Sequence, residues 1–297
     1  MLSILIPTFN HLTTTLVKEL HLQCSKNKII FEILICDDAS TNKKVLLKNS
    51  TLNKLSNVYY IRNKTNIGRS ATRNKLAVTS KYKWLLFIDA DVIPKSKKFV
   101  KKYLDSINNN CGVISGGIAY SKKPKKKEQI LRWKYGKKRE HMSIIYRNNN
   151  PYLSLLSSNF LIKRKIILKN PFNEKISKIA NEDSIFSYDL KSKKIHITHI
   201  DNQVLHENLE NSTIFLEKTL GYAKSSLIFV ESNLIDKNYM KITRTYFTLK
   251  KLKITPFIKY IHYYLGNCFK KHLSSKNPSL FIFDFYRLSY ICYISKD

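Results

Sequence analysis

Trp84-Leu85-Leu86-Phe87-Ile88-Asp89-Ala90-Asp91 joins five apolar residues to two carboxylates that are separated by one small residue. An apolar run of this length, bounded by polar residues, is typical of a central strand that is covered on both faces. Open α/β sheets bind ligands outside the carboxyl ends of their strands, so Asp89 and Asp91 are expected at the mouth of a crevice. Two hard oxygen ligands on a short turn suit Mg²⁺ or Mn²⁺. A solvated turn is the alternative for so short a pattern.

Two apolar segments upstream also predict strands, each followed by a residue type that marks the end of a strand. Residues 2–6 predict a strand that Pro7 ends, since proline cannot donate to a sheet ladder. Residues 31–36 predict a second strand, and Asp37 and Asp38 follow it directly. The first of these aspartates is expected to point into the same crevice as the carboxylates of the opening segment.

A glycine turn and a cationic helix follow. Residues 58–62 predict a third strand, and Gly68 then leads into a helix. Arg69 and Arg73 lie one helical turn apart, at i and i+4, and therefore on one face. A guanidinium offers a planar fork to phosphate oxygens, so this face is a candidate contact for phosphate. An ordinary surface charge explains Arg73 equally well.

Composition bounds the class of protein. The 297 residues suit one large domain with a smaller helical region, and 53 Lys and Arg against 21 Asp and Glu give a formal charge of +32. Such a charge attracts polyanions, so a nucleic-acid-binding protein is a competing interpretation, although the cations match no binding motif. Five widely spaced cysteines without a C-x-x-C pair argue against a zinc site and a disulfide framework. With no spanning apolar run and no secretory signal, we expect a cytoplasmic protein.

Four motifs carry a family resemblance through their order and spacing. They are SILIPTFN at 3–10, CDDAS at 36–40, NIGRSATRN at 66–74 and LLFIDADV at 85–92. Together they resemble the family 2 glycosyltransferases with the GT-A fold. The resemblance implies an α/β, Rossmann-like fold with a mostly parallel central sheet flanked by helices. It covers residues 1–210 as the catalytic domain and leaves 211–297 as a helical C-terminal region.

The resemblance also implies roles for individual residues. In the nucleotide-sugar site it places Pro7, Thr8, Asn10, Asp37, Asp38, Asn66, Gly68, Arg69, Arg73, Asp89 and Ala90. Asp37 is expected to accept from the N–H groups of a uracil or guanine ring. Asp91 is expected to bind the Mn²⁺ or Mg²⁺ that bridges the donor phosphates. His206, after a strand predicted over 199–205, is a second candidate ligand, with a capped or solvated histidine as the alternative.

Asp183, with Glu182 beside it, is the general base that the resemblance implies. It would take the proton of an acceptor hydroxyl while that oxygen attacks the anomeric carbon and inverts its configuration. The pair precedes an apolar-periodic stretch, and the first turn of a helix favours carboxylates for structural reasons as well. Many relatives carry glycine before this pair, where the present run is Ile179-Ala180-Asn181.

The expected acceptor contacts are Trp133 and Tyr135, in a stretch of aromatic and cationic residues, and Asn159, on a strand predicted over 158–162. Sugar rings stack well on such aromatics. A solvated helix that Trp133 anchors to the core is an equally good interpretation of the aromatic stretch.

The C-terminal region has a different pattern. Residues 214–228 carry apolar side chains at helical spacing, and 255–265 and 280–288 are rich in aromatics. Amphipathic helices of this kind lie in a membrane interface, or they pack as a lid on the enzyme or on a second subunit. The first alternative would make the protein peripheral on the inner face of the plasma membrane.

The combined prediction is an inverting, metal-dependent hexosyltransferase. It would move a sugar from a UDP or GDP donor to a glycan or lipid-linked acceptor, in bacterial surface polysaccharide synthesis. A nucleotidyltransferase on the same fold also needs an Asp-x-Asp pair, but residues 3–11 lack the glycine-rich loop that such enzymes usually carry after the first strand.

Overall fold

The computed structural model describes residues 1–108, 111–176 and 181–295. The chain divides into two units. The first comprises Met1–Tyr120, Glu140–Lys178 and Glu182–Asn208, and the second comprises Ser121–Arg139, Ile179–Asn181 and Leu209–Asp297. The second unit therefore includes a segment from the middle of the chain in addition to the C-terminal region expected from residue 211.

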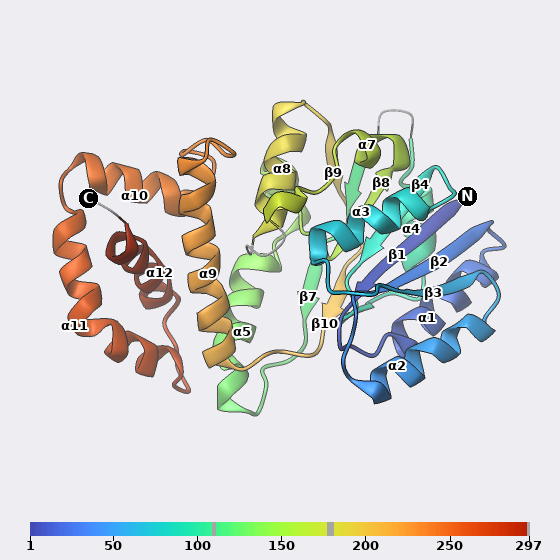
Figure 1. The fold of residues 1–297 in the computed structure, drawn as a ribbon, viewed down its shortest axis with the longest axis horizontal. Helices are drawn as coiled ribbons and strands as arrows, with labels where there is room; N and C mark the ends of the chain where they lie inside the picture. Colours follow the sequence, from blue (N-terminus) through green and yellow to red (C-terminus); the bar gives the residue numbers. More distant parts are fainter. Residues whose placement is uncertain (109–110, 177–180, 296–297) are drawn as a thin grey trace. The chain divides into compact units, whose positions relative to one another are not determined.

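A seven-stranded sheet forms the centre of the first unit (Figure 1). Its strands, in spatial order, are β3 (Val58–Arg62), β2 (Phe31–Asp37), β1 (Leu2–Thr8), β4 (Trp84–Ile88), β8 (Asn159–Lys163), β6 (Val113–Ser115) and β9 (Ile197–His199). β1 to β4 run parallel, β8 is antiparallel to both of its neighbours, and β9 is parallel to β6. The predicted α/β architecture with a mostly parallel sheet is confirmed.

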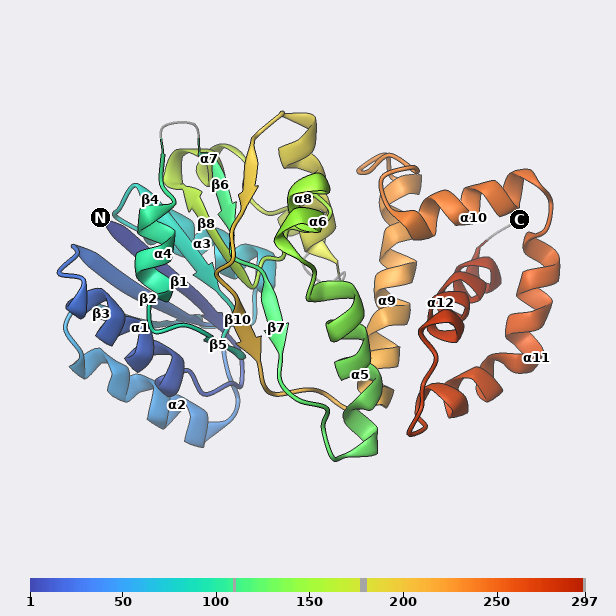
Figure 2. The same ribbon diagram turned by 180° about the vertical axis from the view of Figure 1, so that it is seen from behind.

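Helices cover both faces of this sheet, which is why every residue of β2 and β4 is buried. α3 and α7 lie on one face, and α1 and α4 lie on the other (Figures 1 and 2). The helices of this unit are α1 (Thr14–Lys26), α2 (Lys43–Ser50), α3 (Arg69–Thr79), α4 (Phe99–Asp105), α6 (Ile144–Asn149), α7 (Arg164–Lys169) and α8 (Glu182–Ser192), with short 3₁₀ turns at Thr51–Lys54 and Glu174–Ile176.

Pro7 does not end the first strand, contrary to the prediction. β1 continues to Thr8 and pairs with β2 along its whole length, but its pairing with β4 stops at Leu5. A proline lacks only the N–H donor, so beyond Leu5 it can remain in the strand without breaking a bond to β4.

The first unit also contains a small three-stranded sheet, which includes the last strand of this unit. It consists of β5 (Val92–Pro94), β10 (Val204–His206) and β7 (Ile118–Tyr120), with β10 in the middle. The single strand predicted over 199–205 is therefore wrong. β9 ends at His199 in the large sheet, and β10 begins at Val204 in the small one.

The second unit is helical. It contains α5 (Ile130–Tyr135), α9 (Ser212–Glu231), α10 (Lys241–Lys251), α11 (Thr255–Leu273) and α12 (Leu280–Ile294), with a 3₁₀ turn at Lys127–Gln129 and a π-helical turn at Gly136–Glu140. α12 lies among α9, α10 and α11 (Figure 2). Its Phe283 and Tyr286 join one buried cluster and its Ile291 and Cys292 another. Among the described helices, none combines the length and the apolar character that crossing a bilayer requires.

Candidate active site

Asp89 and Asp91 follow the carboxyl end of β4, where the apolar run before them predicted they would lie. The backbone N–H of Asp89 donates to the carbonyl of Ser158 at 3.2 Å, which ties the acid pair to the segment entering β8. The side chain of Asp89 is 30% exposed and that of Asp91 is 42% exposed. Both carboxylates are therefore accessible at this edge of the sheet.

Arg73 links this acid pair to the carboxylates of α8. Its side chain is only 3% exposed, with Nη2 donating to Oδ1 of Asp89 at 2.9 Å and Nη1 to Oε1 of Glu182 at 3.0 Å. Burial alone would lower the pKa of Arg73, but the charges of Asp89, Asp183 and Glu182 raise it above its ordinary value. A surface-charge role for Arg73 is therefore excluded.

Glu182 and Asp183 open α8 but differ in their surroundings. Glu182 is buried against Arg73, and Nη1 of Arg69 lies 3.9 Å from the same oxygen. Burial, and then the charge of Glu182, raise the pKa of Asp183 to about 6, against the lowering effect of Arg73. Glu182 is thus held in an ion pair, whereas the pKa of Asp183 lies above that of an ordinary aspartate.

The two carboxylate oxygens of Asp183 differ in their hydrogen bonds. Its Oδ2 accepts from the backbone N–H of Ser157 at 3.4 Å. Its Oδ1 is shielded from solvent and has no hydrogen-bond partner within the part of the chain that the structure describes. A buried acceptor without a donor is costly, and a bound hydroxyl would supply one.

The residue before this pair adopts a glycine-like conformation. Asn181 has φ of 80°, in the left-handed region that asparagine tolerates better than most residues. Asparagine at this position is therefore compatible with a backbone conformation that favours glycine. Ile179 and Ala180 lie outside the described residues.

Asp91 and His206 meet because β10 pairs with β5. The antiparallel register sets His206 opposite Val92, the residue after Asp91. Nε2 of His206 lies 3.5 Å from Oδ2 of Asp91, and the imidazole stacks on the Tyr120 ring with 5.7 Å between centroids. Two neighbouring ligands of an octahedral ion, each roughly 2.1 Å from it, are about 3 Å apart. The pair therefore fits one shared divalent ion after a small adjustment.

Protein groups alone do not complete a metal site there. No cluster of three or more His, Cys, Asp or Glu side chains that could hold a metal occurs among residues 1–108, 111–176 and 181–295. A divalent ion between Asp91 and His206 would take its remaining ligands from water and from a phosphate-bearing substrate, as Mg²⁺ commonly does.

Asp37 does not reach the crevice, contrary to the prediction. It is fully buried, with Oδ1 accepting from the backbone N–H of Ser40 at 2.7 Å and Oδ2 from the hydroxyl of Tyr60 at 2.6 Å. Its neighbour Asp38 lines the cavity instead. Asp38 accepts from the backbone N–H groups of Ile67 and Gly68, both at 2.9 Å, and so fixes the turn before α3.

The cavity at this edge of the sheet has a volume of about 300 Å³. It is lined by Pro7, Thr8, Phe9, His11, Asp38, Arg69, Thr72, Arg73, Asp89, Ala90 and Asp91. Sequence reasoning missed Phe9, His11 and Thr72. Phe9 lies between the predicted Thr8 and Asn10 in the first motif, and His11 directly follows that motif. Thr72 shares a helical face with Arg69 at i+3, so the sequence contained a signal for each of the three residues.

Three residues that were predicted to contact the nucleotide sugar support the loops around the cavity and do not line it. Asn10, at φ of 51°, accepts with Oδ1 from the backbone N–H groups of Thr41 and Asn42, both at 2.9 Å. Asn66 donates to the carbonyl of Asp38 at 3.1 Å. Gly68 caps α3 with φ of 87°, a conformation that other residues rarely adopt.

The predicted acceptor residues belong to different units, Asn159 to the first and Trp133 and Tyr135 to the second. Asn159 is 1% exposed, accepts from the hydroxyl of Tyr103 at 2.6 Å and donates to the carbonyls of Gly117 and Asn202. Because its amide is fully engaged inside the first unit, the structure gives it a structural role in place of the predicted acceptor contact. Trp133 and Tyr135 belong to the second unit, where Trp133 donates to the carbonyl of Ser121 and Tyr135 packs between Phe215 and Phe283.

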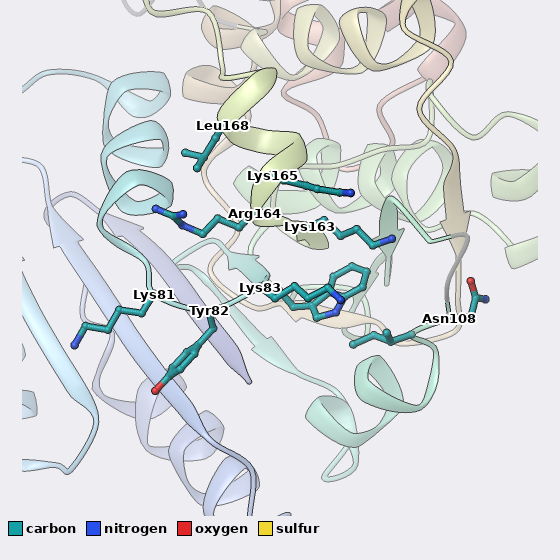
Figure 3. A pocket seen from close by; sticks show the side chains of 10 residues that line it. Lys81, Tyr82, Lys83, Asn108, Lys163, Arg164, Lys165 and Leu168 are labelled. Atoms are coloured by element: carbon teal, nitrogen blue, oxygen red, sulfur yellow. The ribbon is translucent and has the colours of Figure 1, made fainter.

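A larger cavity, of about 690 Å³, lies at the other end of β4 (Figure 3). Lys83, Lys163 and Lys165 line it, and the ammonium of Lys163 lies 5.5 Å from the ring centroid of Trp84. Trp84 begins β4 and pairs with Lys163, whereas Ile88, next to the acid pair, pairs with Asn159. This cavity holds none of the carboxylates described above, so the smaller cavity is the better candidate for catalysis.

Residues 3–169 of the chain match the family described as glycosyl transferase family 2. An uncharacterized glycosyltransferase of Haemophilus influenzae is 33% identical over 143 residues, which cover 44% of this chain and 46% of that relative. The match thus spans less than half the length of the relative.

Two solved structures show the fold. The mannosyltransferase PcManGT from Pyrobaculum calidifontis, in complex with GDP-Man and Mn²⁺, has a TM-score of 0.56 at 12% identity, covering 77% of this chain and 64% of that one. Residues 1–349 of S. aureus TarS, in complex with UDP-GlcNAc, have a TM-score of 0.51 at 18% identity, covering 90% and 74%. The predicted GT-A fold is confirmed.

Proposed function

The chain belongs to glycosyl transferase family 2, and from this premise we propose that it transfers a sugar, with inversion, from a UDP- or GDP-linked donor to a hydroxyl of a glycan or lipid-linked acceptor. The observation that carries the proposal is the buried Arg73. It joins Asp89, beside the candidate metal ligands, to Glu182, beside the candidate base, within one unit of the fold.

The donor would occupy the cavity of about 300 Å³. Its base and ribose would lie against Pro7, Thr8 and Asp38, and Asp89 would contact the ribose from β4. Arg69, which is 63% exposed at the start of α3, would contact the diphosphate, because a guanidinium and a helix N-terminus both favour phosphate oxygens.

Asp91 and His206 would hold Mn²⁺ or Mg²⁺. Bound there, the ion would neutralise negative charge on the departing nucleoside diphosphate more strongly in the transition state than in the ground state. The protein's own contribution is orientation. The β5–β10 register keeps the two side chains together, and Tyr120 holds the imidazole plane.

Asp183 would act as the general base. Its pKa of about 6 leaves it mostly ionised at neutral pH yet more basic than an ordinary aspartate. It would accept the acceptor's proton while the oxygen attacks the anomeric carbon from the side opposite the leaving group. Glu182 would act through Arg73, as a positioning residue that touches neither sugar.

The relatives agree with this donor class. PcManGT is described in complex with GDP-Man and Mn²⁺, and TarS in complex with UDP-GlcNAc. A donor of either kind therefore suits this fold. A role in bacterial surface polysaccharide synthesis stays a prediction from the family resemblance.

A thermal-shift screen of UDP- and GDP-sugars, with and without Mn²⁺, tests the proposal. We expect at least one compound to raise the Tm of the full chain only when Mn²⁺ is present, since a ligand that binds the native state stabilises it. Asp91→Asn should abolish this shift while leaving the Tm without ligand unchanged, because Asp91 is 42% exposed. Stabilisation by none of the donors would contradict the assignment.

A further inference from the structure

α11 presents two opposite faces of different character. Its inner face packs on α12 through Ile258, His262 and Phe269, and Nδ1 of His262 lies 2.8 Å from the hydroxyl oxygen of Ser289. Its outer face carries Phe257, Tyr260 and Tyr264, at helical spacing of three and four residues. The inner face accounts for the packing of the helix, and the outer aromatic residues take no part in it.

These outer aromatics are unusually exposed. Phe257 is 66% exposed, Tyr260 62% and Tyr264 57%, and neighbouring Tyr263 is 67% exposed. The Tyr260 and Tyr264 rings lie 4.4 Å apart between centroids, and those of Tyr263 and Tyr264 lie 4.9 Å apart. We call these three tyrosines, together with Phe257 three residues before Tyr260, the α11 aromatic face. Apolar surface of this kind normally marks an interaction site.

The chain around this face contains cations and no carboxylate. Residues 237–283 include nine lysines and one arginine, and not one Asp or Glu. The cations are Lys237, Lys241, Arg244, Lys250, Lys251, Lys253, Lys259, Lys270, Lys271 and Lys276. In a chain that has 21 acidic residues elsewhere, a stretch of this length without one makes the region locally single-signed.

We propose that the α11 aromatic face is a docking surface for an anionic lipid bilayer. Helix α11 would lie in the plane of the interface, with Phe257, Tyr260 and Tyr264 below the headgroups and the lysine ammonium groups at the lipid phosphates. Aromatic rings with one polar end favour this depth, and lysines extend to the phosphates from the sides of such a helix. Its 19 residues give about 28 Å of contact.

A second copy of the chain fits this surface less well. Bringing two such helices together would set Lys259, Lys270 and Lys271 of one copy near those of the other, with no carboxylate in residues 237–283 of either copy to pair them. A bilayer with anionic headgroups supplies the missing negative charge and the apolar layer together. The inference does not depend on the proposed transferase activity.

Flotation of the full chain with vesicles tests the proposal. We expect binding to mixed phosphatidylglycerol–phosphatidylcholine vesicles, weakened by salt, and little binding to phosphatidylcholine alone. The triple variant K259Q/K270Q/K271Q should lower the partition coefficient by roughly 100-fold, at about fivefold per lysine. The variant F257S/Y260S/Y264S should lower it by roughly tenfold or more.

A matched control removes equally exposed apolar residues from the first unit. Leu47 and Ile145 are 72% and 73% exposed, and L47S/I145S should bind vesicles like the native chain. Native-like vesicle binding by the aromatic variant would overturn the proposal. The proposal would also be overturned if no form of the chain bound vesicles. In that case, analytical ultracentrifugation and titration with single-stranded nucleic acid would show whether the face mediates self-association or nucleic-acid binding instead.

A probe that leaves the aromatic residues intact provides an independent readout. Cys268, one turn after Tyr264, is the exposed thiol of the five, and Cys24, Cys36, Cys111 and Cys292 are buried. An environment-sensitive fluorophore attached to Cys268 should shift to shorter wavelength with anionic vesicles and not with neutral ones. An unchanged spectrum in the presence of bound vesicles would place the contact elsewhere and overturn the proposal.

Discussion

Arg73 and Glu182, 109 positions apart in the chain, form a buried ion pair of 3.0 Å that fastens the first turn of α8 to helix α3. The other terminal nitrogen of Arg73 holds Asp89 at 2.9 Å. One cation thus fixes the distance between the acid pair after β4 and the carboxylates of α8. In the proposed mechanism, this is the distance between the donor and the base.

Arg73→Ala should destabilise the fold by about 3–5 kcal/mol, because it removes the hydrogen-bonded partner of the buried Glu182 and leaves only Arg69, 3.9 Å away, near that charge. Chemical denaturation measures the change in the free energy of unfolding. Arg69→Gln is the matched control on the same helix. Since Arg69 is 63% exposed, it should cost less than about 0.5 kcal/mol while still weakening donor binding. Equal losses of stability in the two variants would contradict the assigned roles.

Asp183→Asn should reduce kcat by roughly 10²–10⁴-fold with little effect on donor affinity, as expected for loss of a general base. In the native enzyme, activity should fall as the pH drops below about 6, where Asp183 becomes protonated. Steady-state kinetics across pH 5 to 8, roughly the range around this pKa, give both results. Full activity of the Asn variant would remove Asp183 from the mechanism.

Stability should depend on pH through the same group. The pKa of Asp183 is about 6 in the fold and near its ordinary value of about 4 in the unfolded chain, so the folded state binds this proton more tightly. Its contribution to stability is therefore present at low pH and is lost as the pH rises from about 4 to about 6. The Asn variant should lack this loss, and denaturation at several pH values would reveal it as a growing advantage over the native chain.

Asn159→Ala should destabilise the protein by about 2–4 kcal/mol, since it removes three buried side-chain hydrogen bonds, one from the hydroxyl of Tyr103 and two to the carbonyls of Gly117 and Asn202. Tyr103→Phe removes one of these bonds and should cost about 1–2 kcal/mol. In the folded fraction, both variants should keep the native KM for acceptor. A large rise in that KM without loss of stability would restore the predicted acceptor contact.

Asp38→Asn should raise the donor KM, because the two carboxylate oxygens accept separately from the backbone N–H groups of Ile67 and Gly68, and an amide sets its NH2 group against one of these donors and so disturbs the turn before α3. Tyr60→Phe, which removes a partner of the buried Asp37, should cost about 1–2 kcal/mol of stability and leave the donor KM within about twofold. Measured together, the two variants separate the aspartate that lines the cavity from the one that supports the sheet. The opposite pattern would return the donor contact to Asp37.

The strands and the acid pair could be predicted because their signals are local. A continuous apolar run followed by Asp89 and Asp91 fixes a buried strand and its exposed end within one short segment. The same pattern misled at Asp37, because two adjacent carboxylates after a strand do not reveal which one meets a buried hydroxyl. That choice depends on Tyr60, one strand away in the sheet.

Non-local pairing explains the remaining differences. The approach of His206 to Asp91 depends on the β5–β10 register, which periodicity does not encode. The burial of Arg73 depends on Glu182, more than a hundred residues later. The sequence therefore left two interpretations of Arg73 open, a phosphate contact and a surface charge. Tyr135, predicted as an acceptor contact from its aromatic neighbourhood, packs on Phe215 and Phe283 of helices that follow far along the chain.

Isothermal titration of UDP and GDP into the full chain, with and without Mn²⁺, tests the central claim most directly, namely that Asp91 and His206 hold a divalent ion that binds the donor diphosphate. We expect binding of at least one nucleotide to require Mn²⁺ and to be lost in both Asp91→Asn and His206→Ala, with the fold of each variant intact. Binding of equal strength without the metal ion, or in both variants, would contradict it.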